Sequence, residues 1–454
     1  MNGISYPTIR VEAGPDALVS TSGGRLLVQA AQVSGLAAAL SQGLAGFASN
    51  RARHDPGKVL LDLVVTIAAG GECLSDLGVL RAQPQLFGAV ASDPTVSRLF
   101  DSLTVTEQAA AAAIGAIRAA AGAARIGVWQ RVDPLGGAEQ VTVDLDATLI
   151  GSHSDKQGAA ANYKRGFGFH PLLAMVDHGD GGTGEPLVGL LRPGNAGAGT
   201  QVDHIAVLDA ALGQLPESCR DQVLVRADGA GGTKEFLTHV IGLGLQYSTG
   251  ITVHAALQEA LAATPRQAWR KALDAHGAPR PDAYVAELTP RLPARFTAAW
   301  PAGMRVIARR EKAHPGAQLR IGEDDGWRVT MFVTNSPGRP AELEYRHRLR
   351  ARAEDRIRDL KDTGAGNLPF HAMAKNALWL ELCLLACQLL TWTQLLAFHD
   401  HDSARVWTPK TLRFRILAVA GRIIRSGRRQ TLRISDKWPW ADLIRQGHHR
   451  LAAL

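Results

Sequence analysis

The stretch Val141-Thr142-Val143-Asp144-Leu145-Asp146 alternates apolar and polar side chains and ends in an aspartate. A period of two predicts a β-strand with one buried face. A second apolar run, 223–227, ends in Asp228. A carboxylate at the end of a buried strand is costly to desolvate unless positive charge meets it. Two such carboxylates brought together suit a hard divalent cation, which prefers oxygen ligands.

Further strand and helix patterns surround these two runs. The expected elements are strands at 141–146, 171–176 and 186–191, a helix at 201–213, a strand at 223–227, a helix at 233–243 and a strand at 245–252. Three meandering strands followed by a helix, a strand, a helix and a strand is the order of an RNase H-like core. The sequence therefore predicts an α/β fold that brings Asp146 and Asp228 into one such core.

Changes in composition divide the rest of the chain, whose 454 residues predict two or three domains. The predicted regions are a helical DNA-binding domain at 1–132, the first part of the RNase H-like core at 133–254, a β-rich insertion at 255–338 with strands at 304–308 and 328–334, the last core helices at 339–402, and a helical, basic, DNA-contacting region at 403–454. The insertion thus separates the core strands from the core's last helices.

The charged helical stretch from about 340 to 361 carries the candidate third carboxylate, Glu354. At 3.6 residues per turn, His347, Arg350, Glu354 and Lys361 fall on one helix face. One interpretation is a solvated face of ion pairs, because other charged residues crowd this helix. The second is a metal-binding carboxylate flanked by cations that hold a phosphate backbone. The order of two strand-end aspartates and then a helical glutamate favours the second interpretation.

These motifs resemble the DDE transposases of bacterial insertion sequences, in the group 1 transposase DDE family. The resemblance rests on the segments 144–148, 191–195, 225–229 and 354–361, and it extends over nearly the whole chain, including 413–440. Related cut-and-paste transposases carry a Tyr-x-x-Arg-x-x-x-Glu-x-x-x-x-x-x-Lys signature. Arg350, Glu354 and Lys361 match this signature, whereas His347 stands in place of the tyrosine.

The resemblance implies that Asp146, Asp228 and Glu354 are the catalytic residues and the metal ligands. Asp144 is the alternative for the first position, and Glu381 is a weaker alternative for the third. Two Mg²⁺ or Mn²⁺ ions would activate a water and stabilise the leaving 3′ oxygen. The resemblance further implies joining of the freed 3′-OH to target DNA, with hairpin ends as one route.

The formal net charge of +8 favours a polyanionic partner. Between Arg405 and the last residue, twelve arginines and lysines face only Asp436 and Asp442. A helix beginning near Thr95 could enter a major groove or simply pack. The predicted DNA-contacting residues are His347, Arg350, Arg358, Lys361, Lys164, Arg165, Trp300, Trp327, Arg422, Arg425, Arg428 and Arg429. The two tryptophans are candidates for stacking on an unpaired base.

The expected partners are transposon-end DNA and target DNA, bound by a homodimer or a larger assembly. The apolar stretch 377–398 is interrupted by Glu381, Gln388 and Gln394, so a buried helix is expected rather than a membrane span. Scattered cysteines favour a reducing compartment, and we expect a bacterial cytoplasmic protein associated with the nucleoid. Two rivals remain: a divalent-metal nuclease or resolvase without strand transfer, and a catalytically silent DNA-binding derivative.

Overall fold

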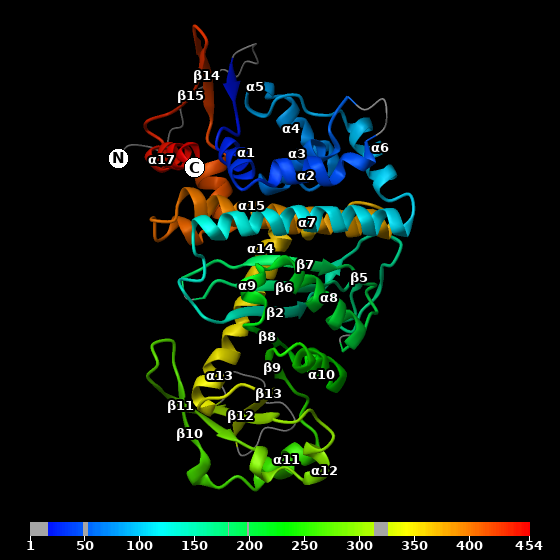
Figure 1. Ribbon diagram of the computed structural model, residues 1–454, viewed down its shortest axis with the longest axis vertical. Coiled ribbons are helices and arrows are strands. Elements are labelled where there is room, and N and C mark those ends of the chain that lie inside the picture. The colour runs from blue at the N-terminus through cyan, green and yellow to red at the C-terminus, as the bar shows by residue number, and fades with distance from the viewer. Residues whose placement is uncertain (1–16, 49–52, 180, 198, 313–325) are drawn as a thin grey trace, which may run out of the picture.

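The computed structural model describes residues 17–48, 53–179, 181–197, 199–312 and 326–454. Three regions follow one another along the longest axis of the molecule (Figure 1). Helices from both ends of the chain form one end, a large sheet lies in the middle, and the insertion forms the other end. The fold is mixed α/β, as predicted.

The N-terminal region is helical, and a short strand β1 (Leu18–Val19) precedes it. Its helices are α1 (Gly24–Val33), α2 (Leu36–Leu44), α3 (Pro56–Ala68), α4 (Gly78–Arg81), α5 (Pro84–Phe87), α6 (Asp93–Leu103) and α7 (Glu107–Arg131). Side-chain caps start two of them: Asp55 accepts from the Lys58 N–H, and Thr106 accepts from the Ala109 N–H. These helices share one apolar core with the long helix α15 (Met373–Ala397).

The central sheet is continuous over nine strands, in the order β10-β11-β12-β13-β9-β8-β2-β6-β7. The strands are β2 (Val141–Ala147), β6 (Leu172–Asp177), β7 (Glu185–Leu190), β8 (Val223–Ala227), β9 (Gln246–Gly250), β10 (Arg270–Leu273), β11 (Pro279–Glu287), β12 (Arg305–Lys312) and β13 (Trp327–Thr334). Strand β2 pairs antiparallel with β6 and parallel with β8, and β8 pairs parallel with β9. The five strands predicted between 141 and 252 are confirmed.

Helices cover both faces of this sheet, because the strands alternate their apolar side chains. Leu172 and Ala174 of β6 pack in the core formed with α8 (Gln201–Gln214) and α10 (Lys234–Gly242). Leu173 and Met175 face the other way, into the core that contains α15. A Cβ on Gly189 would lie 2.9 Å from the Leu384 side chain, so the small residue lets α15 approach β7 closely.

The insertion extends the sheet instead of forming a separate one. It contains α11 (Ala255–Ala262), α12 (Ala294–Thr297) and four strands, of which β12 and β13 were predicted and β10 and β11 were not. Strand β13 joins the core strand β9 through only three residue pairs: Phe332 with Gly250, Val333 with Thr249, and Thr334 with Ser248. Continuous pairing therefore links the insertion to the strand beside β8.

The stretch predicted to be helical after the insertion forms consecutive short helices. It consists of α13 (Pro340–Arg348), a 3₁₀ turn (Leu349–Ala351) and α14 (Arg352–Leu360), before a turn with Gly364 at φ 83° leads to α15. Helices α7 and α15 are both long and apolar enough to cross a membrane by length and composition alone. In α15, 94% of the apolar window is buried inside the protein, as expected for a core helix.

The prediction of a helical C-terminal region was wrong in one part. The chain forms α16 (Pro409–Leu412), a hairpin of β14 (Gly421–Ser426) and β15 (Arg429–Ile434), and then α17 (Ala441–Ala453). Aliphatic and β-branched residues on both sides of Gly427, which has φ 59°, favour a hairpin over a helix. The smaller elements are α9 (Glu217–Arg220) and a three-stranded sheet of β3 (Ile150–Gly151), β5 (Phe167–Phe169) and β4 (Ala160–Ala161).

Candidate active site

Asp146 and Asp228 lie at neighbouring strand ends, on the parallel strands β2 and β8. The last paired residues are Leu145 and Ala227, so the two aspartates follow side by side. Asp228 Oδ1 accepts a 2.9 Å hydrogen bond from the Ala230 N–H, which fixes its side chain at the turn. Burial raises the pKa of the Asp146 carboxyl to about 6, and the nearby Asp228 carboxylate adds to this rise. The fold thus brings two carboxylates together at one sheet edge.

Arg350 links this aspartate pair to the helices α13 and α14. Its Nη1 lies 3.0 Å from Asp146 Oδ2, and its Nη2 lies 3.8 Å from Glu354 Oε1. Because Arg350 sits in the 3₁₀ turn between α13 and α14, it points at the end of β2 while Glu354 lies in the first turn of the next helix. The Glu354 side chain is 68% exposed. The guanidinium therefore supplies positive charge to the half-buried Asp146.

A buried ionic network lies beneath this edge. Arg226 of β8 donates to both oxygens of Asp144, with Nε–Oδ1 at 2.7 Å and Nη2–Oδ2 at 2.8 Å. The same Nη2 lies 2.7 Å from Asp177 Oδ2, and Arg356 of α14 reaches Asp177 Oδ1 at 2.7 Å. Burial alone would raise the pKa of Asp177, but Arg356 and Arg226 lower it to about 2. The network ties β2, β6 and β8 to α14.

This network distinguishes Asp144 from Asp146. Asp144 is fully buried, and Arg226 engages both of its oxygens. Asp146 lies nearer the surface, with 13% of its side chain exposed, and so it is the better placed of the two to meet a ligand. Glu381, the weaker alternative to Glu354, is buried in α15 and pairs with Arg118 at 2.8 Å. This network was not predicted from the sequence. The feature that could have indicated it is an arginine inside an otherwise apolar strand, which lies opposite Asp144 in the sheet.

His347 and Lys361, the two ends of the predicted helix face, contact the sheet and its loops. The His347 ring stacks on Phe332 with centroids 4.4 Å apart, and its Nδ1 lies 3.0 Å from Ser248 Oγ. Burial lowers the pKa of this imidazole to about 3, so it is neutral at physiological pH. Lys361 donates to the Leu149 carbonyl at 2.9 Å, just after β2. Both predicted phosphate contacts stay predictions.

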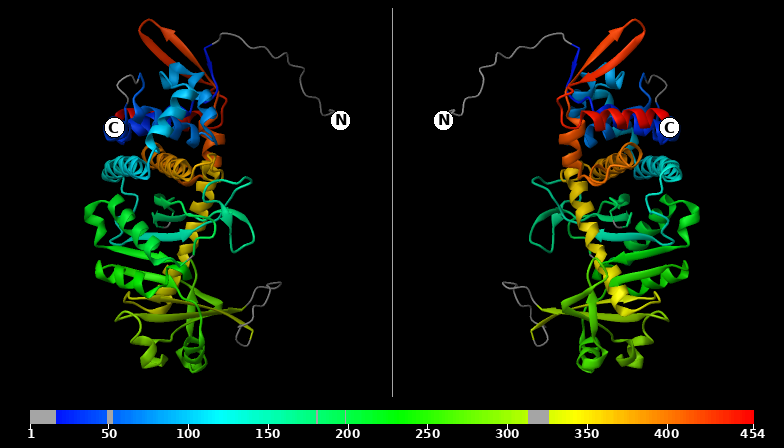
Figure 2. Two further views of the ribbon diagram at one scale, coloured as in Figure 1. Left: turned by 90° about the vertical axis from the view of Figure 1, so that its right-hand side faces the viewer. Right: turned by 90° about the vertical axis from the view of Figure 1, so that its left-hand side faces the viewer.

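The other predicted DNA contacts of the core and insertion lie on several elements. Lys164 and Arg165 are exposed in the turn between β4 and β5, which projects beside the sheet in Figure 2. Arg358 is exposed and pairs with Asp355 at 2.9 Å. The Trp300 ring packs near Phe296, and the Lys234 ammonium lies 5.7 Å from its centroid. The Trp327 ring meets Tyr284 edge-on. The structure brings none of these five predicted contacts into the ion pairs around Asp146.

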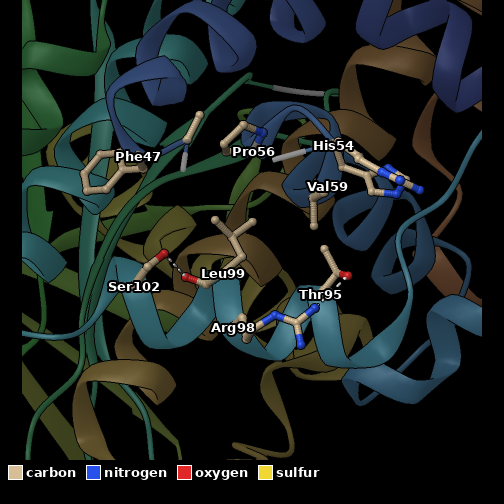
Figure 3. A pocket seen from close by; sticks show the side chains of 10 residues that line it. Phe47, His54, Pro56, Val59, Thr95, Arg98, Leu99 and Ser102 are labelled. Atoms are coloured by element: carbon tan, nitrogen blue, oxygen red, sulfur yellow. Dashed lines mark hydrogen bonds between the residues drawn. The ribbon is translucent and has the colours of Figure 1, made fainter. Parts of the chain in front are cut away.

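The helix proposed for groove reading is α6. Its Val96 and Phe100 are buried in the N-terminal core, whereas Arg98 is exposed. The face that carries Arg98 lines a cavity of about 570 Å³ (Figure 3). The cavity is lined by Phe47, Ala48, Arg53, His54, Pro56, Val59, Thr95, Arg98, Leu99 and Ser102. The helix therefore packs through Val96 and Phe100 and exposes one basic residue, Arg98, and its role in groove reading stays a prediction.

The chemistry of the strand-end carboxylates fits a hard divalent cation, which takes oxygen ligands. The carboxylates of Asp146 and Asp228 repel each other, as expected at such a site, because a bound cation would relieve the repulsion. Over the described ranges 17–48, 53–179, 181–197, 199–312 and 326–454, no three His, Cys, Asp or Glu residues are grouped closely enough to hold one ion. Among the residues that the structure describes, Arg350 is the link between Glu354 and the aspartate pair.

The raised pKa of Asp146 predicts how the stability of the metal-free protein depends on pH. From pH 4 to 6 the folded state holds a proton that the unfolded state has lost, so unfolding free energy falls as pH rises. Asp146→Asn removes the buried charge. We expect this variant to be more stable than wild type at pH 7.5, by roughly 1–3 kcal/mol, and equal near pH 4.

Urea unfolding in the presence of a chelator measures this effect at both pH values. The matched control is Asp221→Asn, because Asp221 is exposed just before β8. A stability difference between Asp146→Asn and wild type that is the same at pH 4 and pH 7.5 would contradict the assignment.

Two strand-end aspartates and a glutamate on a later helix, placed around one mixed sheet, are the features of a DDE transposase. The chain belongs to the family described as transposase DDE domain, group 1, whose model matches residues 1–454. Members of this family generally use divalent metal ions.

No curated protein matches the chain in sequence. Among solved structures, the chain is similar to the piggyBac transposase in a cryo-EM structure of its synaptic complex with hairpin DNA. The two are 9% identical with a TM-score of 0.43, and the match covers 86% of this chain and 80% of that one.

Proposed function

We propose that this protein is a cut-and-paste DNA transposase that binds terminal inverted repeats, cleaves the ends and transfers the 3′-OH ends into target DNA. The observation that carries the proposal is the meeting of Asp146 and Asp228 at adjacent strand ends, with Arg350 linking Glu354 to them. The strand order β7-β6-β2-β8-β9 supports an RNase H-like core, because β2 pairs antiparallel with β6 on one side and parallel with β8 on the other.

Asp146, Asp228 and Glu354 are the proposed catalytic and metal-binding residues. They would hold two Mg²⁺ or Mn²⁺ ions, which supply an activated water and stabilise the leaving oxygen. The protein's own part is to hold these carboxylates in place. The turn at Ala230 fixes Asp228, and the network of Arg226, Asp144, Asp177 and Arg356 fixes α14, from which Glu354 projects.

DNA would be held by cations that surround this edge. Lys361 and Lys164 lie close enough for the ammonium of Lys164 to lower the pKa of Lys361, after the larger effect of burial. A phosphate between them would relieve that repulsion. Trp300 lies beside Lys234, the first residue of the helix that follows Asp228. This position near Asp228 supports a role for Trp300 in stacking on an unpaired base if the ends form hairpins. Two ends must be joined, so a dimer or a larger assembly on DNA is expected.

Strand transfer by the purified full-length chain tests the proposal. A labelled duplex that ends in the element's terminal repeat, already cut to expose its 3′-OH, is incubated with supercoiled plasmid and Mg²⁺. We expect plasmid joined to the label, and none when a chelator replaces Mg²⁺. Cleavage of uncut ends without joining would instead identify a nuclease or resolvase. DNA binding without either reaction would identify a silent derivative.

A further inference from the structure

The hairpin of β14 and β15 stands away from the helical body, at the end of the molecule opposite the insertion (Figures 1 and 2). Its register is regular, with Arg422 opposite Arg433 and Ser426 opposite Arg429. Six residues in each strand correspond to about 20 Å of length. At its base, β14 also pairs with β1, so the hairpin is anchored to the N-terminal region by backbone hydrogen bonds.

The two faces of the hairpin have different chemistry. Directly opposed residues share a face, so Ile423 and Leu432 lie together on one side. Ile423 is buried in the N-terminal core, and Leu432 packs against that core. The opposite face carries the cross-strand pair Arg422 and Arg433. One face therefore docks on the protein, and the other is turned outward.

Positive charge without a counter-charge is the distinguishing property of the hairpin. Residues 421–434 contain five arginines and no acidic residue, and all five are exposed: Arg422, Arg425, Arg428, Arg429 and Arg433. Within the part of the chain that the structure describes, no carboxylate forms an ion pair with any of them. Arg226, Arg350 and Arg356, by contrast, are all neutralised by aspartates.

Folding alone does not account for this charge. Like charges directly opposite each other in a sheet destabilise it, and Arg422 faces Arg433 in that way. An external anion that bridges such arginines would remove the repulsion. Guanidinium groups suit phosphate oxygens and the guanine edge, because their forked donors bind two acceptors at once.

We infer that the hairpin is a two-stranded ribbon whose tip and outer face lie in the major groove of duplex DNA. The major groove admits a two-stranded β-ribbon, and the minor groove is about half as wide. Single-stranded DNA is held mainly by stacking on aromatic rings, and residues 421–434 contain no aromatic residue. The inference rests on the proposed function, since it takes the duplex to be a transposon end held away from the cutting site.

The test compares two triple variants in an Asp228→Asn background without divalent metal, so that binding is read without cleavage. The hairpin variant is Arg428→Gln, Arg429→Gln and Arg433→Gln, which changes the tip and the outer face. The control is Arg131→Gln, Arg266→Gln and Arg295→Gln, three exposed arginines elsewhere with the same loss of charge. Fluorescence anisotropy gives the affinity for a 30-base-pair duplex with the terminal repeat, and for its single strand, over a range of KCl. Circular dichroism verifies that both variants are folded.

We expect the hairpin variant to lose at least about tenfold in duplex affinity. The slope of log K against log salt should be smaller in magnitude by about 2–3 for this variant than for the control. Dimethyl sulfate should show guanine N7 protected by the Asp228→Asn protein and by the control, and exposed with the hairpin variant. Equal losses in both triple variants, protection confined to adenine N3, or a greater loss on single strands would overturn the inference. Failure of strand transfer by wild type would sink the proposed function and leave this binding result standing.

Discussion

Asp228→Asn is expected to reduce end cleavage in Mg²⁺ by at least about a thousandfold, because it removes one of the three carboxylates that would hold the metal ions. Asparagine is chosen because its amide oxygen can still accept the Ala230 N–H that Asp228 accepts at 2.9 Å. The local turn should therefore survive. The rate of cleavage of a labelled terminal-repeat duplex measures the loss, and duplex affinity without metal should stay within about threefold of wild type.

Asp221→Asn is the matched control, since Asp221 precedes the same strand that Asp228 follows. It carries the same change of charge and leaves the sheet edge intact, so its cleavage rate should equal that of wild type. Undiminished cleavage by Asp228→Asn would refute the assignment of this residue. Equal losses in both variants would point to net charge and not to metal binding.

Arg226→Met is expected to lower the free energy of unfolding by about 3–5 kcal/mol, because it removes both short hydrogen bonds to the buried Asp144 and leaves that carboxylate only the 3.4 Å contact to Arg356. Arg226 is 1% exposed, and it binds Asp144 through two hydrogen bonds and Asp177 through a third. Methionine fills a similar volume, so the loss reflects the stranded charge more than a cavity. Urea unfolding at pH 7.5 in a chelator gives the value.

Two further variants separate this effect from a general loss of a basic residue. Arg220→Met changes a partly exposed arginine whose side chain donates to the Leu215 and Gly213 carbonyls, and it should cost less than about 1 kcal/mol. Adding Asp144→Asn to Arg226→Met should recover a large part of the lost stability, because the carboxylate that lost its partner is gone while Asp177 still neutralises Arg356. No recovery would show that the charge is not the cause.

Short-range patterns in the sequence predicted most of the core. The alternation that ends in Asp146 and the apolar run that ends in Asp228 indicated two strands, and the structure places these strands next to each other. The periodicity of the stretch 340–361 indicated the helices that carry Glu354. These features depend on neighbours along the chain, so a single sequence can carry them.

Contacts between distant residues were beyond such reasoning. Arg226 and Asp177 are 49 positions apart, and nothing in their local sequence pairs them. The 3₁₀ turn at Leu349–Ala351 directs Arg350 toward Asp146, whereas a regular helix was assumed. The C-terminal hairpin was not predicted for another reason. The many arginines of this segment were taken to indicate DNA contact, whereas its apolar residues Ile423, Leu432 and Ile434, which favour strands, were not considered.

The three residue pairs between β13 and β9 have a consequence for how this protein can change in evolution. Deleting the insertion would leave the backbone groups of β9 open to other chains, beside the strand that carries Asp228. An exposed strand of this kind recruits other strands, and aggregation follows. A shorter descendant of this protein would therefore need another segment that pairs with β9. We expect the segment 255–338 to be inherited together with the rest of the sheet.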